Sequence, residues 1–184
     1  MTKFLKLFLL TLTFYSCTQK RQIRYYWVSF RGHEYEKSDT TQIMQVDRFQ
    51  NGDTSIFSYV TKFGSISYFI MKNKDSSFLI SNPKDSVNHP NDSLVFIRLF
   101  FDTSIIFHND TFKIKKYICD EFVTDGASVY YYEPTLGIYV AHSNTWPGIR
   151  YLQTSDTIIN KKIDALIKAT VPGFFIRDKL KAIL

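Results

Sequence analysis

Cysteine is scarce in this chain of 184 residues, which holds only Cys17 and Cys119. An exported protein that relied on disulfides would normally contain more, so the sequence does not indicate a disulfide scaffold. Seven glycines and five prolines are too few for a collagenous or low-complexity chain. The apolar run over residues 7–15 is about half as long as a membrane-spanning helix requires, which argues against a transmembrane segment.

Motifs of catalysis and metal binding are also missing. The glycines stand singly, so no phosphate-cradling loop is formed, and no serine has the flanking glycines of a nucleophile elbow. His33 with Glu34 and Glu36 comes closest to a metal cluster, but on a strand His33 would point away from Glu34. We therefore expect no metal, no cofactor and no catalytic residues.

The formal net charge of +6 is concentrated at the C-terminal end. Residues 17–156 hold fifteen basic and fifteen acidic side chains, whereas residues 157–184 hold six basic and two acidic ones. A nucleic-acid-binding protein should carry a basic stripe over its body, so we expect no nucleic-acid partner. The basic end is either a solvated face or a surface that rests on acidic lipid headgroups.

Aromatic residues, by contrast, are abundant, with 12 Tyr and 17 Phe, and they favour strands. Turn residues recur about every 8 to 12 positions, which is typical of an antiparallel sheet. The pattern predicts strands over residues 23–31, 42–49, 55–63, 65–72, 77–81, 94–101, 104–107, 111–119, 128–133, 137–142 and 149–153. A helix is predicted over residues 157–170, with Asp156 as its N-cap and Pro172 after its end.

The predicted fold class is α+β and mainly β. We expect a single antiparallel sheet system, a curved sheet or half-barrel, with a C-terminal amphipathic helix, in one domain over residues 23–184. In residues 111–118 the alternation places Lys113, Lys115 and Tyr117 on a solvated face, opposite Phe112, Ile114 and Ile118. Strand 94–101 is apolar on both faces and should be central. The helix should pack through Ile159, Ile163 and Leu166 and turn its lysines outward.

Candidate contact residues come from aromatic clusters and from the one cation in the apolar strand 94–101. Residues 25–27 and 130–132 are aromatic triplets, and adjacent rings on a strand point to opposite faces. We take Trp27, Tyr131, Trp146 and Arg98 as candidate contacts for an apolar ligand or a partner protein. The alternatives are that the rings cover the sheet or pack under the helix, and that the Arg98 guanidinium lies over neighbouring rings. Cys119 is interpreted as a semi-buried structural thiol.

The first seventeen residues have the shape of a secretory signal, with two lysines, the apolar run and then Ser16 and Cys17. At this point the sequence resembles bacterial lipoproteins, whose signal ends in a lipobox before an invariant cysteine. Phe14, Tyr15, Ser16 and Cys17 fill the four positions as a relaxed lipobox. The resemblance implies that residues 1–16 are removed, that Cys17 is acylated, and that residues 17–22 form a short tether.

The resemblance further implies a lipid-anchored protein of the cell envelope, in an outer membrane and facing the periplasm, because Thr18 is not the Asp associated with inner-membrane retention. We expect a non-catalytic interaction or apolar-ligand carrier module. The alternative from a different class is an envelope hydrolase whose site is built from loop residues His89, His108 and His142.

Three other interpretations of the sequence stay open. The N-terminal segment could be an ordinary signal peptide with an incidental cysteine, or an uncleaved anchor. A secreted eukaryotic protein is the third, because glycosylation sequons begin at Asn91 and Asn109.

Overall fold

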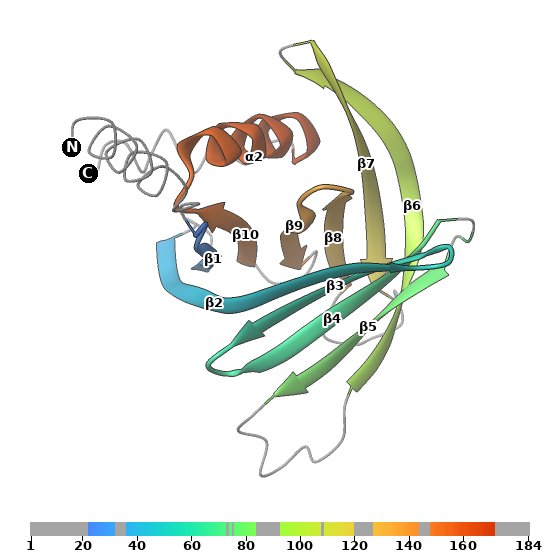
Figure 1. Ribbon diagram of the computed structural model, residues 1–184, viewed down its shortest axis with the longest axis horizontal. Coiled ribbons are helices and arrows are strands. Elements are labelled where there is room, and N and C mark those ends of the chain that lie inside the picture. Colours follow the sequence, from blue (N-terminus) through green and yellow to red (C-terminus); the bar gives the residue numbers. More distant parts are fainter. Residues whose placement is uncertain are drawn as a thin grey trace, which may run out of the picture.

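The computed structural model describes residues 22–31, 36–72, 74, 76–83, 93–107, 109–119, 127–143 and 148–171. These residues form ten strands and one helix (Figure 1). Their bounds are β1 (Tyr25–Arg31), β2 (Glu36–Asn51), β3 (Thr54–Thr61), β4 (Gly64–Met71), β5 (Ser76–Pro83), β6 (Ser93–Phe107), β7 (Asp110–Cys119), β8 (Ser128–Glu133), β9 (Gly137–Ser143), β10 (Gly148–Thr154) and α2 (Thr157–Thr170).

The strands form one closed antiparallel barrel. Each strand pairs with its neighbours in the chain, and β1 also pairs with β10, from Tyr25 opposite Thr154 to Arg31 opposite Gly148. The prediction of a mainly β antiparallel fold with a C-terminal helix is confirmed, but the expected curved sheet or half-barrel is wrong. Side chains alternate in the same way in an open and a closed sheet, so the sequence pattern carries no sign of closure.

Strand β6 replaces two strands that the sequence predicts separately. Asp102 interrupts the apolar pattern there, but its carboxylate lies 3.5 Å from the Lys115 ammonium on β7, so the strand continues through the polar position. The register between β6 and β7 shifts between Leu99 and Phe101. Because of this bulge, Phe101 lies on the outer face of the barrel, where its ring meets Tyr131 at 6.3 Å.

The middle of the barrel is filled by aromatic rings. The Tyr59 ring of β3 lies edge-on to the rings of Trp27 on β1 and Tyr68 on β4, with ring centres 5.3 Å and 6.0 Å apart. Its hydroxyl donates to the carbonyls of Leu136 and Ile138 across the barrel, each at 3.3 Å. Burial raises the pKa of Tyr59 far above its ordinary value of 10.0, so the hydroxyl keeps its proton as a donor. The rings therefore divide the interior into two separate ends.

Helix α2 lies on the outside of the barrel, beside β10 (Figure 1). Asp156 caps it by accepting from the backbone nitrogens of Ile158 and Ile159, as the sequence predicts. Its buried residues are Ile163, Leu166, Ile167 and Thr170. The Thr170 hydroxyl lies 3.2 Å from that of Tyr139, on the outer face of β9. Of the predicted contact residues, Ile163 and Leu166 are buried and Ile159 is partly buried.

Candidate functional site

A chamber of about 560 Å³ opens at the end of the barrel where the β2–β3, β4–β5 and β8–β9 turns gather. We call it the basic chamber. Its volume falls within the range of small-molecule pockets. It is lined by Arg48, Phe49, Gln50, Ser55, Phe57, Ile70, Lys72, Asp102, Lys113, Lys115, Tyr132 and Pro134.

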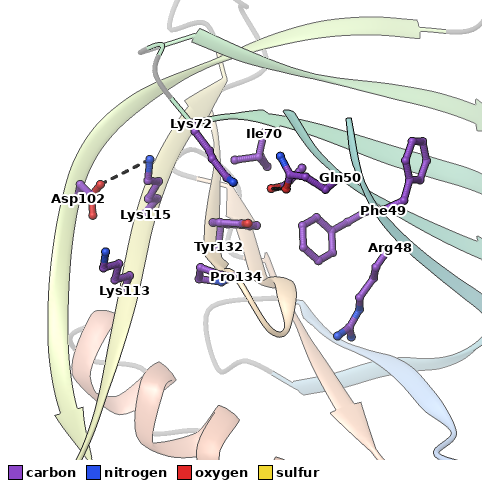
Figure 2. A pocket seen from close by; sticks show the side chains of 12 residues that line it. Arg48, Phe49, Gln50, Ile70, Lys72, Asp102, Lys113, Lys115, Tyr132 and Pro134 are labelled. Carbon is purple, nitrogen blue, oxygen red and sulfur yellow. Dashed lines mark hydrogen bonds and ion pairs between the residues drawn. The ribbon is translucent and has the colours of Figure 1, made fainter. Parts of the chain in front are cut away.

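Cations predominate among the lining side chains. Arg48, Lys72, Lys113 and Lys115 come from opposite walls of the chamber (Figure 2), and Asp102 is the one carboxylate among the lining residues. Asp102 is paired with Lys115, so it neutralises one cation and leaves three in excess. Arg48, Lys72 and Lys113 are exposed to solvent. The opening of the chamber is therefore positively charged and accessible.

The floor of the chamber is apolar and buried. Phe57, Ile70 and Tyr132 are exposed by only 4%, 2% and 5%. The rings of Phe57 and Tyr132 meet edge-on at 5.4 Å and close the chamber against the central rings. Burial raises the pKa of Tyr132 above its ordinary value, so its hydroxyl stays neutral beside the cations.

Arg48 is held in place from several sides. Its guanidinium lies 5.7 Å from the centre of the Tyr25 ring and 5.9 Å from that of Phe57, and it donates to the Thr135 carbonyl. Tyr25 is the first residue of β1, so the chain enters the barrel at the end where the basic chamber opens.

The β8–β9 turn that receives Arg48 is organised by Glu133. This carboxylate is almost fully buried and accepts from the Thr135 and Leu136 backbone nitrogens, both at 2.9 Å, and from the Thr135 hydroxyl at 2.6 Å. The Lys162 ammonium of α2 lies 3.3 Å from it and donates to the Thr135 hydroxyl at 2.6 Å. The helix and the basic chamber are thus connected through one turn. The prediction that Lys162 faces outward is wrong, because the buried carboxylate attracts it inward.

A smaller chamber of about 280 Å³ lies at the opposite end of the barrel. Its polar lining includes Arg31, Arg150, Tyr68 and Tyr130, and Arg150 also lies 5.9 Å from the centre of the Trp27 ring. No carboxylate or thiol is among the described residues that line it.

The structure does not bring the candidate contact residues together. Trp27 faces the interior and belongs to the central rings, whereas Tyr131 is buried on the outer face of β8, beside Tyr139 and His142. Arg98 is exposed on the outer face of β6, away from both chambers. Trp146 lies outside the described residues, as do Cys17, His33, Glu34, His89 and His108.

His142 is the one residue of the hydrolase alternative that the structure describes. Its ring stacks on Tyr131 at 6.0 Å, and its Nδ1 lies 3.3 Å from the Ser143 carbonyl. Burial lowers its pKa below the ordinary value of 6.5, which favours the neutral ring. Among the described residues, no group of three His, Cys, Asp or Glu side chains could hold a metal ion.

The sequence prediction does not group the residues of the basic chamber into a site. Lys113 and Lys115 were assigned to one face correctly, but that face lines the barrel interior, where Lys113 stays exposed at the opening of the chamber. Tyr117 lies on the same face as the two lysines, and this aromatic residue is the sequence signal that part of the face is enclosed, as its complete burial in the structure shows.

Comparison of the chain with protein-family models, curated proteins and solved structures finds no match. In the part of the chain that the structure describes, no helix is long and apolar enough to cross a membrane.

Proposed function

We propose that this protein is a non-catalytic envelope lipoprotein that carries amphipathic anions, each with an acidic head and an apolar body, in the basic chamber. The observation that supports this most directly is the excess of three cations around a buried apolar floor in a chamber of about 560 Å³.

The two parts of the chamber favour a ligand with two matching parts. An acidic headgroup at the opening would be stabilised by Arg48, Lys72 and Lys113, because charge-assisted hydrogen bonds are stronger than neutral ones. An apolar chain would displace water from Phe57, Ile70 and Tyr132, at about 25 cal/mol per Å² of apolar surface buried. A small inorganic anion would leave the floor unused, and a neutral apolar ligand would gain nothing from the cations.

The proposed anchor at Cys17 gives such a carrier a location beside lipid. Eight residues run from Cys17 to Arg24, and at about 3.3–3.6 Å per residue they span at most roughly 26–29 Å. Because β1 enters the barrel beside Arg48, this short tether would hold the opening of the basic chamber near the membrane.

Competition binding tests the ligand class. Hexadecanoate and hexadecanol share a chain and differ in the head, so each is titrated against a fluorescent fatty acid bound to the protein. Exposed charge contacts are worth about 0.2–1 kcal/mol each, so Lys72→Gln with Lys113→Gln should weaken hexadecanoate binding roughly 2- to 30-fold. Hexadecanol binding should not change.

The matched control is Lys161→Gln with Lys168→Gln, which removes two exposed lysines from α2. This control should bind hexadecanoate as the native protein does. The proposal fails if neither compound binds, or if both double variants lose affinity equally.

A further inference from the structure

A row of apolar side chains crosses the outer face of five neighbouring strands. Phe49 of β2 pairs with Ile56 of β3, Ile56 with Phe69 of β4, Phe69 with Phe78 of β5, and Phe78 with Phe96 of β6. We call these five residues the outer belt. The rings of Phe69 and Phe78 stack with their centres 4.5 Å apart, and the centres of the Phe78 and Phe96 rings are 6.5 Å apart.

The outer belt is exposed to solvent at both of its ends. Phe49 is 57% exposed and Phe96 is 62% exposed, although large apolar residues normally avoid water. Phe100 on β6 extends the exposed surface and is 58% exposed. Between these ends Phe69 and Phe78 are half-buried and Ile56 is buried, and the exposed Arg98 separates Phe96 from Phe100 on β6. Exposed aromatic side chains grouped on one face in this way mark a binding face for a protein or a membrane.

The surroundings of the outer belt favour a lipid surface. On β3, β4 and β5 the described side chains of the outer face are all uncharged, being apolar, Ser or Thr. Cations outnumber acids at the two ends of these strands, with Lys62 in the β3–β4 turn at one end and Lys72 and Lys74 after β4, beside Asp53, at the other. An apolar centre between basic ends is complementary to acyl chains below anionic headgroups.

The position of the tether favours the same occupant. The chain enters β1, which is the neighbour of β2, and the outer belt begins on β2 at Phe49. Phe49 also borders the basic chamber (Figure 2). A membrane in contact with the outer belt would therefore meet the opening of the chamber.

We propose that the outer belt seats the barrel on an anionic phospholipid surface, so that amphipathic ligands pass between the membrane and the basic chamber at Phe49. This inference extends the proposed carrier function and uses its anchor. A carrier held only by its anchor would release its ligand into water, whereas a seated barrel exchanges it at the bilayer.

Depth-dependent fluorescence quenching tests the contact. The full chain is purified from membranes and reconstituted into vesicles of phosphatidylcholine with phosphatidylglycerol, brominated in the middle of the acyl chains. Phe96→Trp places a reporter in the outer belt, and Ala169→Trp places one on the exposed side of α2, at the opposite wall of the barrel. Emission of the native protein is subtracted, and circular dichroism checks that both variants fold.

The Phe96→Trp reporter should shift to the blue and be quenched severalfold more than the Ala169→Trp reporter. Its quenching should decrease when phosphatidylglycerol is replaced by phosphatidylcholine. Equal quenching of the two reporters, or none in either, would overturn the inference. A blue shift of Phe96→Trp that grows with protein concentration in detergent and needs no lipid would also overturn it, because a second copy would then cover the belt.

Binding of hexadecanoate is measured on the same samples and separates the two proposals. Ligand binding without preferential quenching contradicts the outer belt alone. Preferential quenching without ligand binding contradicts the carrier function and leaves the membrane contact standing.

Discussion

Replacement of Gly137 by alanine should destabilise the barrel and distort the basic chamber together. Gly137 has φ +79°, a conformation that costs a residue with a side chain roughly 1–2 kcal/mol. Part of this cost, about 0.4–1 kcal/mol, is offset because alanine restricts the unfolded chain. The new Cβ would also lie 2.6 Å from Cδ1 of Phe57 and closer still to the Tyr59 hydroxyl.

Neither neighbour of Gly137 can move away without loss. The Tyr59 hydroxyl is held by the carbonyls of Leu136 and Ile138, and the Phe57 ring packs against Tyr132 in the chamber floor. Overpacking of this kind costs typically about 1–3 kcal/mol. The expected loss in the free energy of unfolding is therefore about 1–4 kcal/mol, with weaker hexadecanoate binding because the floor is displaced.

Gly52→Ala is the matched control, because Gly52 has φ +55° and no atom lies within 4 Å of an added Cβ. It should keep only the conformational cost, about 0–1.5 kcal/mol after the offset. Urea unfolding followed by circular dichroism compares the two variants. If Gly137→Ala loses no more stability than Gly52→Ala, the cross-barrel packing of Tyr59 and Phe57 is not as described.

Three further predictions concern the helix, the histidine and the anchor. Leu166→Ala should lower the free energy of unfolding, measured in urea, by about 2–5 kcal/mol, since Leu166 on the buried face of α2 is only 1% exposed, and a loss below about 1 kcal/mol would contradict this packing. Burial lowers the pKa of His142 in the folded protein, so its contribution to the free energy of unfolding is complete above pH 6.5 and is lost as the pH falls through the lower folded pKa. His142→Asn should flatten this part of the plot of stability against pH, and an unchanged slope would contradict the burial of the ring. Cys17→Ser should release the protein from membranes without changing its urea midpoint, and retention after a salt wash would exclude the lipid anchor.

Local signals in the sequence were sufficient to predict the position of the helix. Its bounds agree with the structure because Asp156 is a side-chain cap and Pro172 follows the last turn. Strand positions could likewise be predicted from turn residues such as Gly52, whose positive φ the β2–β3 turn requires. These features depend on a few neighbouring residues, which is why the sequence shows them.

The barrel interior and the basic chamber depend on distant residues and could not be predicted in the same way. Alternation groups Lys113 with Lys115, but it does not say which face is enclosed, and closure depends on the pairing of β1 with β10. Arg48 meets the β8–β9 turn only because the barrel brings residues far apart in the sequence together. Glu133 gave no sequence signal of its own, because its role comes from the turn that follows it and from Lys162.

Photolabelling with a diazirine analogue of hexadecanoate, followed by mass spectrometry of the labelled peptides, tests the carrier proposal most directly. The diazirine sits near the methyl end of the chain, where the chamber floor should enclose it. The account predicts that labels concentrate on Phe57, Ile70 and Tyr132, and that excess unlabelled hexadecanoate removes them. Labels confined to Tyr68 and Tyr130 of the opposite chamber, or absent from the interior, would contradict it.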